Sequence, residues 1–254
     1  MNVEVFLTGK DVTEEDVKGR TVVVIDVLRT SSTITTALHF GARSVVPVAD
    51  TAEAGKIAAN LDSSSYLMGG ERDGLKIEGY HLGNSPLEYV RSVVQNRTII
   101  LNTTNGTGAI IRARAAEDLV IGCLLNADRV VQFVRERARD VVIICSGWRN
   151  RLSLEDTLCA GLILYQLWNG QEPLLVTDTA HIAFSQYLND REQLQDAIRQ
   201  CNQAQHLYEQ GFHEDVDYCA RLNALPLLPI FKDRQLVLHM DPLHEVKPVP
   251  SQTR

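Results

Sequence analysis

The chain has 254 residues, of which 44% are hydrophobic and 22% charged, and its formal net charge is −7. This length is large for one core and suits two modest α/β lobes. The acidic balance argues against a general nucleic-acid-binding protein, which would usually be basic. No apolar run approaches a membrane span, and the first residues lack the pattern of a secretory signal. Five widely spaced cysteines without a CxxC pair favour a cytoplasmic protein with free thiols.

Strand-like and helix-like segments alternate through the first two thirds of the chain. The expected strands are 22–26, 44–48, 65–69, 97–101, 119–124 and 141–145. The expected helices are 31–40, 52–61, 85–94, 105–115, 126–138 and 153–168. Such alternation predicts an α/β fold, with a mainly parallel sheet or sheets and flanking helices.

Beyond residue 170 this alternation ends. Residues 178–211 predict helices rich in Gln, Asp and Arg, and residues 213–221 predict one more short helix. The proline-containing segment from residue 226 is expected to be extended or irregular, with a loose tail from about residue 247.

A domain boundary is expected near residue 122. It divides the chain into an N-terminal α/β lobe with anion and metal loops, 1–122, and a helix-rich C-terminal α/β lobe, 123–254. The sequence leaves open whether the protein forms a homo-oligomer.

The first candidate site residue is Asp26, which directly follows the buried strand 22–25. Acids are depleted in strands, so an acid in this place is notable, although a structural cap is the alternative. Arg29 and the hydroxyl residues 30–33 follow, where a helix is expected to begin. A helix N-terminus suits a phosphate, and a neighbouring carboxylate suits a divalent cation bridging protein and phosphate. In open α/β sheets, ligands bind beyond the carboxyl ends of the strands.

Further polar loops follow the other strands. Glu71 and Arg72 stand in a glycine-rich turn and can supply a metal ligand and a phosphate-binding fork. The segment 102–108 combines hydroxyls, amides and glycines before a helix, which makes a donor-rich anion cradle. Each loop has a structural alternative as a turn or cap, and Glu155 and Asp156 are most economically explained by the dipole of the helix that they open. The recurrence of such loops at several strand ends favours an anion and metal site.

Six segments in order resemble the 2-phosphosulfolactate phosphatase family. They are Asp26–Thr33, Gly70–Arg72, Gly83–Pro86, Thr103–Thr107, Ser153–Asp156 and Gly211–Val216. The resemblance extends from about residue 22 to residue 230. The chain has Ser31-Ser32 where the family usually has Ala-Thr, and Ser32 keeps the hydroxyl.

This resemblance implies a Mg²⁺-dependent hydrolase. Its substrate would be (R)-2-phospho-3-sulfolactate or a related phosphorylated 2-hydroxy acid, and in organisms that make coenzyme M the reaction is a biosynthetic step. The expected partner is thus a small anionic phosphorylated molecule, with neither nucleic acid nor membrane involved. An acidic protein must hold such an anion through local donors and a cation.

The candidate residues fall into three groups. The catalytic candidates are Asp26, Arg29, Glu71 and Arg72. The substrate-binding candidates are Thr30, Ser31, Ser32, Thr33, Asn84, Thr103, Thr104, Asn105, Gly106, Thr107, Cys145, Ser146 and Gly147. The metal-ligand candidates are Asp26, Glu71 and Asp215, with Glu155 in reserve. Arg29 and Arg72 are expected to contact the phosphate or acid groups of the substrate.

The attacking group is left open by the sequence. An aspartyl-phosphate mechanism is disfavoured, because Leu28 stands where the DxDx[TV] pattern requires a second acid. We favour a water held by the metal ion. Two rival functions remain: a cysteine-dependent amidohydrolase that uses Cys145, and a non-catalytic protein that binds sugar phosphates.

Overall fold

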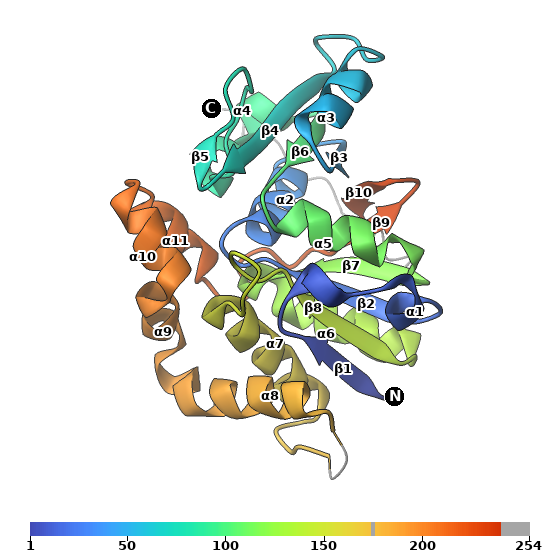
Figure 1. Ribbon diagram of the computed structural model, residues 1–254, viewed down its shortest axis with the longest axis vertical. Coiled ribbons are helices and arrows are strands. Elements are labelled where there is room, and N and C mark those ends of the chain that lie inside the picture. The colour runs from blue at the N-terminus through green and yellow to red at the C-terminus, as the bar shows by residue number, and fades with distance from the viewer. Residues whose placement is uncertain (174–175, 240–254) are drawn as a thin grey trace, which may run out of the picture.

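The computed structural model, which describes residues 1–173 and 176–239, contains a ten-stranded mixed sheet with helices on both faces (Figure 1). The strand order is β1-β8-β2-β7-β9-β10-β3-β6-β4-β5. The strands are β1 (Val3–Phe6), β2 (Thr21–Ile25), β3 (Ser44–Pro47), β4 (Tyr66–Arg72), β5 (Leu75–Lys76), β6 (Thr98–Asn102), β7 (Asp118–Gly122), β8 (Val141–Cys145), β9 (Pro229–Lys232) and β10 (Gln235–Leu238). The α/β class with a mostly parallel sheet is therefore confirmed.

Helices connect most of the parallel strands. The α-helices are α1 (Glu14–Val17), α2 (Thr30–His39), α3 (Thr51–Ala58), α4 (Arg91–Val94), α5 (Gly106–Arg112), α6 (Ala127–Arg137), α7 (Leu154–Leu167), α8 (Asp178–Asp190), α9 (Leu194–Gln200), α10 (Asn202–Glu209) and α11 (His213–Cys219). Short 3-10 helices lie at η1 (Gly9–Asp11), η2 (Pro86–Glu88), η3 (Ala113–Ala115), η4 (Leu124–Asn126) and η5 (Arg191–Gln193). Among the described residues, no helix is long and apolar enough to cross a membrane.

The sheet consists of two parallel groups joined by the β9–β10 hairpin. Strands β1, β8, β2 and β7 are parallel to one another, and so are β3, β6 and β4. The contacts β7–β9, β9–β10 and β10–β3 are all antiparallel, so the two groups run in opposite directions across the hairpin. Helix α2 connects β2 to β3, and α5 begins the return from β6 to β7 (Figure 1). The carboxyl ends of β2 and β6 meet, since the Thr30 hydroxyl donates to the Thr103 hydroxyl at 3.2 Å.

Burial of both faces of β2 explains why its sequence is a continuous apolar run. Val22 and Val24 belong to the cluster that contains α2 and α5 side chains. Val23 and Ile25 belong to the cluster under α6 and α7. A parallel strand buried on both faces has no polar side and therefore lacks alternation. The strand consequently fixes the position of Asp26, the first residue after it.

The structure corrects one expected helix and adds one strand. The helix expected at 85–94 is interrupted between η2 and α4, where the fully buried Tyr89 donates its hydroxyl to the Gly83 carbonyl at 2.7 Å. The segment from residue 226, expected to be extended or irregular, contains the extended strands β9 and β10. Edge strand β1 has no counterpart among the expected strands, because its four residues give little periodicity.

The domain division stays a prediction. Strand β8 lies between β1 and β2, so ranges 1–122 and 123–254 contribute neighbouring strands to one sheet. The tail expected from about residue 247 lies outside the described residues. All five cysteines are free, as the sequence predicts, and all five are buried.

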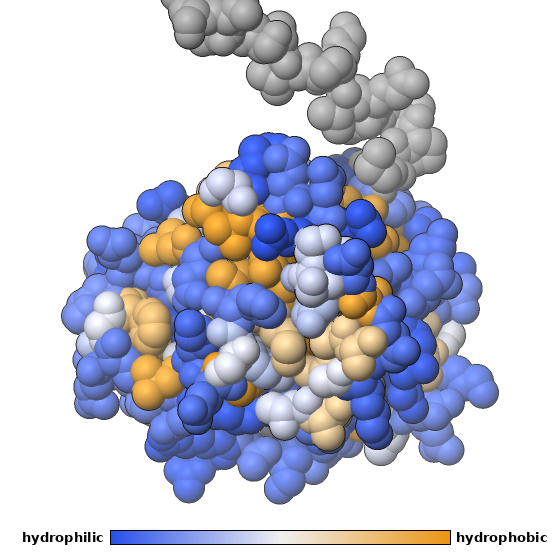
Figure 2. Space-filling view, turned by 90° about the horizontal axis from the view of Figure 1, so that it is seen from above, coloured by the Kyte–Doolittle hydropathy of each residue, from blue (hydrophilic) through white to orange (hydrophobic). Residues whose placement is uncertain are grey.

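Figure 2 shows the face of the molecule seen from above Figure 1, where apolar residues gather near the middle and polar residues surround them. In the segment 61–90, the large apolar side chains Leu61, Leu75, Leu87 and Val90 are exposed. Contiguous exposed apolar surface often marks an interaction site. Homo-oligomer formation stays a prediction.

Candidate active site

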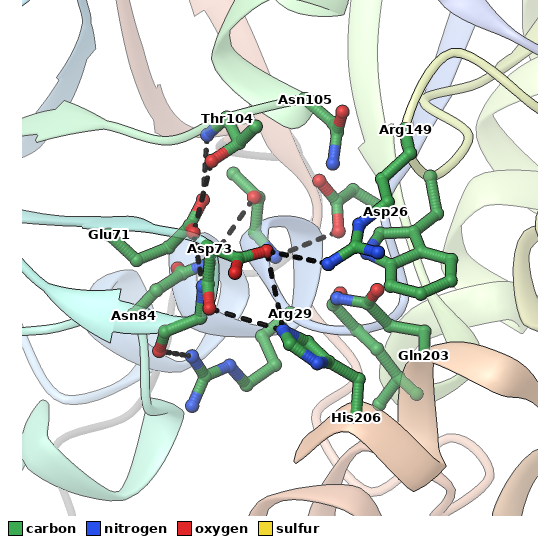
Figure 3. A pocket seen from close by; sticks show the side chains of 14 residues that line it. Asp26, Arg29, Glu71, Asp73, Asn84, Thr104, Asn105, Arg149, Gln203 and His206 are labelled. Carbon is green, nitrogen blue, oxygen red and sulfur yellow. Dashed lines mark hydrogen bonds and ion pairs between the residues drawn. The ribbon is translucent and has the colours of Figure 1, made fainter. Parts of the chain in front are cut away.

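A cavity of about 40 Å³ lies where the loops after β2, β4, β6 and β8 meet α10 (Figure 3). It is lined by Asp26, Leu28, Arg29, Thr30, Glu71, Asp73, Gly74, Asn84, Thr104, Asn105, Trp148, Arg149, Gln203 and His206. Ligand sites of open α/β sheets occupy this position beyond the carboxyl ends of the strands. We call Asp26, Arg29 and Glu71 the floor of the cavity, and Asp73, Arg149 and His206 its mouth.

Asp26 is held against the start of α2. Its carboxylate accepts from the Thr30 backbone N–H at 3.1 Å, and its own N–H donates to Ser31 Oγ at 2.9 Å. Only 6% of the residue is exposed. A Cβ on Gly106 would come within 2.4 Å of Asp26 Oδ2, so a glycine is required where α5 approaches this carboxylate.

Glu71 is fixed by the β6–α5 loop and by its own turn. Thr104 donates its backbone N–H to Oε1 at 2.6 Å and its hydroxyl to Oε2 at 3.1 Å. The Gly74 N–H also donates to Oε2, at 2.8 Å. Because these donors come from the backbone and a short side chain, the buried carboxylate has a defined orientation before any ligand arrives.

Four acidic side chains are concentrated around β2. Burial, then the charge of Asp156 and more weakly that of Glu71, raise the pKa of Asp26 to about 7, against the lowering effect of its hydrogen bonds with Thr30. Burial followed by the charge of Glu155 raises the pKa of Asp156, and burial, followed more weakly by Asp26, raises that of Glu155. Buried like charges disfavour full ionisation, so this region would be stabilised by a cation.

Asp156 is buried, and its hydrogen bonds join the segments that follow β2 and β8. Its carboxylate accepts from the Val27 N–H at 2.8 Å and from the Gly147 N–H at 3.2 Å. Ser146 donates its hydroxyl to the same carboxylate at 3.1 Å. Ser146 and Gly147, expected at the substrate, therefore contact Asp156 and do not line the cavity.

Arg29 reaches the floor but contacts protein acceptors. Its Nη1 donates to Asp215 Oδ2 at 2.6 Å and its Nη2 to the Gly74 carbonyl at 2.7 Å. The guanidinium lies 4.3 Å from the centre of the Phe212 ring. Arg29 and Asp215 are 2% and 3% exposed, and Ser85 donates to the other Asp215 oxygen. Arg29 thus joins α2, α11 and the β4–β5 turn.

The expected hydroxyl and amide residues divide into two sets. Thr30, Asn84, Thr104 and Asn105 line the cavity. The others are buried and contact the protein itself. Ser31 donates to the Val24 carbonyl, Ser32 to the Val27 carbonyl, Thr33 to the Asn84 carbonyl, and Thr103 and Thr107 bind each other.

Several other candidates lie away from the cavity. Arg72 is exposed, and its guanidinium donates to the Glu71 carbonyl and to Asn102 Oδ1. Glu155 lines a neighbouring cavity with Cys201. Cys145 is fully buried at the end of β8, and burial raises the pKa of its thiol well above the usual value.

The expected three-carboxylate metal cluster is not formed. In residues 1–173 and 176–239, no three His, Cys, Asp or Glu side chains are grouped so that they could hold one metal ion. Asp215 contacts Arg29 and Ser85 and is absent from the cavity wall. Asp26 and Glu71 remain as two carboxylates that line the same cavity, which fits Mg²⁺, because this ion usually takes one or two carboxylates plus waters and substrate phosphate.

Sequence reasoning missed seven residues of the cavity wall, among them Leu28 and Gly74, which adjoin predicted site residues, and five that carry polar or aromatic side chains. These five are Asp73, Trp148, Arg149, Gln203 and His206. Asp73 and Arg149 stand in or beside loops that the sequence marks as polar, so a wider window would have included them. Gln203 and His206 lie on an ordinary amphipathic helix, α10, and give no local signal.

The fold and this cavity define an α/β protein with a cavity lined by buried carboxylates at its strand ends. The family model of 2-phosphosulpholactate phosphatase matches residues 6–234. The chain therefore belongs to the 2-phosphosulfolactate phosphatase family, and it is an enzyme, a phosphatase.

Similar proteins include two that are named probable 2-phosphosulfolactate phosphatases. The protein of Symbiobacterium thermophilum is 40% identical over 224 residues, which are 88% of this chain and 96% of the relative. The protein of Caldanaerobacter subterraneus subsp. tengcongensis is 36% identical over 233 residues, which are 92% of this chain and 96% of the relative.

Proposed function

We propose that this enzyme hydrolyses the phosphate ester of a 2-hydroxy acid, with (R)-2-phospho-3-sulfolactate as the substrate and Mg²⁺ as the cofactor. The observation that carries the proposal is the cavity floor, where the buried carboxylates of Asp26 and Glu71 line the same cavity and Asp26 accepts from the first residue of α2. The family to which the chain belongs supports the substrate.

Asp26 and Glu71 would hold the ion. A bound Mg²⁺ supplies positive charge that offsets the phosphoryl oxygens. The raised pKa of Asp26 supports this assignment, because a cation would replace the repulsion from Asp156 and Glu71 with attraction. Three hydrogen bonds orient Glu71, so its carboxylate needs little rearrangement.

The protein's own groups would position the ester. Thr30 and Asn84 line the cavity, and the Asn84 amide lies 3.5 Å from the Thr30 hydroxyl. Asn105 adds a second amide beside Asp26 (Figure 3). These neutral donors surround the floor without adding negative charge. Attack by water in line with the leaving oxygen requires such fixed positioning more than covalent help from the protein.

Two other functions receive less support. An amidohydrolase would need a reactive Cys145, but burial keeps this thiol protonated and it is absent from the cavity wall. A non-catalytic binding protein would use the same donors without turnover.

Phosphate release distinguishes these functions. We expect release from 2-phospho-3-sulfolactate in Mg²⁺ and its loss in EDTA, with recovery when Mg²⁺ is restored. A panel of phosphorylated 2-hydroxy acids then ranks substrates by kcat/KM. Ligand-induced thermal stabilisation without phosphate release would favour the binding protein, and metal-independent turnover would contradict the proposed cofactor.

A further inference from the structure

The mouth of the cavity contains two side chains that can be positively charged. Arg149 and His206 line the cavity together with Asp26 and Glu71 of the floor. Both contact one carboxylate, Asp73. Arg149 Nη2 lies 3.1 Å and His206 Nε2 lies 3.4 Å from Asp73 Oδ1, so Asp73 stands between them (Figure 3).

Local structure holds Arg149 in this place. Trp148 and Arg151 pair through their backbones, and Arg149 and Asn150 between them have φ of 51° and 59°. The Arg149 guanidinium lies 4.5 Å from the centre of the Trp148 ring, and the same ring lies 5.7 Å from that of His206. A tight turn and an aromatic platform therefore support the Arg149–His206 pair.

Arg29 is the other cation on the cavity wall, but its terminal nitrogens already donate to Asp215 and Gly74. The partner of Arg149, in contrast, is an exposed side chain: Asp73 is 68% and Arg149 57% exposed. Ion pairs between exposed side chains contribute little and can exchange. An incoming anion can thus replace Asp73 on Arg149 at small cost.

The proposed substrate needs such a second site. A phosphorylated 2-hydroxy acid has, beside its phosphate, a carboxylate one carbon from the ester carbon, and sulfolactate adds a sulfonate. The carboxylates of the floor would repel these groups. The Arg149 guanidinium in the same cavity would attract them, and it can donate two parallel hydrogen bonds to paired oxygens.

We propose that Arg149, together with His206, binds the second acidic group of the substrate, a carboxylate or a sulfonate, in the place that the Asp73 carboxylate occupies in the free enzyme. This inference rests on the proposed function, since it assigns the part of the substrate other than phosphate. Arg149 is then the residue that selects phosphate esters with a neighbouring acid. Asp73 competes with the substrate for it.

Four phosphate esters test the selection. They are 2-phospholactate, which has only the carboxylate, 2-phosphooxypropane-1-sulfonate, which has only the sulfonate, 2-phospho-3-sulfolactate, which has both, and isopropyl phosphate, which has neither. We expect Arg149→Gln to lower kcat/KM about 10- to 100-fold for esters with the recognised group, the contribution of a charge-assisted hydrogen bond. Isopropyl phosphate should be affected about twofold at most, because surface changes of this kind stay near 0.5 kcal/mol.

The matched control is Arg151→Gln, which removes an exposed arginine two residues away that does not line the cavity. Asp73→Asn removes the competing charge and retains a residue type that tolerates the φ of 50° found here. We expect it to lower KM for the acidic esters by a larger factor than for isopropyl phosphate. An equal loss on all four esters in Arg149→Gln, or a raised KM in Asp73→Asn, would overturn the inference.

Calorimetric titration with sulfolactate separates this inference from the proposed function. The wild-type enzyme should bind this product-like acid, and Arg149→Gln should bind it about tenfold more weakly or worse. If no ester is hydrolysed but this difference is found, the proposed function fails and the acid site stands. If esters are hydrolysed and sulfolactate binds both proteins equally, the acid site fails alone.

Discussion

The floor and the mouth of the cavity hold their charges in opposite ways. Floor residues Asp26, Arg29 and Glu71 are 2–7% exposed and are fixed by backbone groups or buried partners. Mouth residues Asp73 and Arg149 are more than half exposed and contact each other. A buried, fixed charge is preorganised for chemistry, whereas an exposed pair costs little to rearrange. We therefore expect changes at the floor to lower turnover and changes at the mouth to alter substrate preference.

Asp26→Asn is expected to have the largest effect. It removes one of two carboxylates proposed to hold Mg²⁺, and loss of a metal ligand or of its orienting shell often costs about 10–100-fold. Because the change also removes a buried charge, the fold should persist. Phosphate release at saturating Mg²⁺ and calorimetric Mg²⁺ titration measure the effect. The control is Asp196→Asn, whose side chain is 60% exposed. Wild-type turnover and Mg²⁺ affinity in a folded Asp26→Asn protein would remove this residue from the site.

Arg29→Lys is expected to have the next largest effect. A lysine keeps the charge but cannot reach Asp215, the Gly74 carbonyl and the face of Phe212 at once. The β4–β5 turn that orients Glu71 would then shift, and misplacement by ~1 Å can cost up to about 100-fold in rate. Steady-state phosphate release and thermal melting, with the exposed Arg199→Lys as control, measure the outcome. Near-normal kinetics with a lower Tm would limit Arg29 to stability.

The sequence predicted the floor better than the mouth, for a physical reason. Asp26 directly follows β2 and Glu71 lies near the end of β4, and the sheet brings strand ends together, so local patterns predict their meeting. Arg149 and His206 meet because α10 packs against two loops. No periodic pattern in the sequence predicts this packing. The same distinction explains why the ion pair of Arg29 was not predicted. The sequence indicates a cation at position 29, but its partner Asp215 belongs to a helix distant in the chain.

The stability of the folded protein is expected to depend on pH, because the buried carboxyl groups of Asp26, Asp156 and Glu155 have pKa values raised to about 7. Unfolded carboxyls titrate near ~4, so the unfolded state releases these protons first. The contribution of these three carboxyl groups to the free energy of unfolding is therefore complete below about pH 4, and it is lost as the pH rises through about 7. In EDTA, the Tm should therefore fall between about pH 5 and about pH 8.

Glu155→Gln should reduce this fall, because it removes a buried charge without changing the cavity lining. We expect a higher Tm than wild type at about pH 8, by about 2–4 °C per kcal/mol gained, and little change at about pH 5. Glu192→Gln, at a side chain 85% exposed, is the control and should have no effect. A lower Tm at both pH values would mean that the Glu155 carboxylate forms an essential contact.

The smallest effect is expected from Arg72→Gln. This variant tests whether the role of Arg72 follows from its place beside Glu71 in the sequence or from the place of its side chain in the structure. Arg72 adjoins the floor residue Glu71 in the chain, and the sequence predicts contact with the substrate. In the structure its side chain is exposed and donates to Asn102 and to the Glu71 carbonyl, away from the cavity wall. A glutamine can keep one of these bonds, so kcat/KM should change about twofold at most, within the ±0.5 kcal/mol of an ordinary surface change. A loss as large as that of Arg29→Lys, on all esters, would require Arg72 to turn into the cavity when substrate binds. The floor would then not be preorganised, and its distinction from the mouth would have to be abandoned.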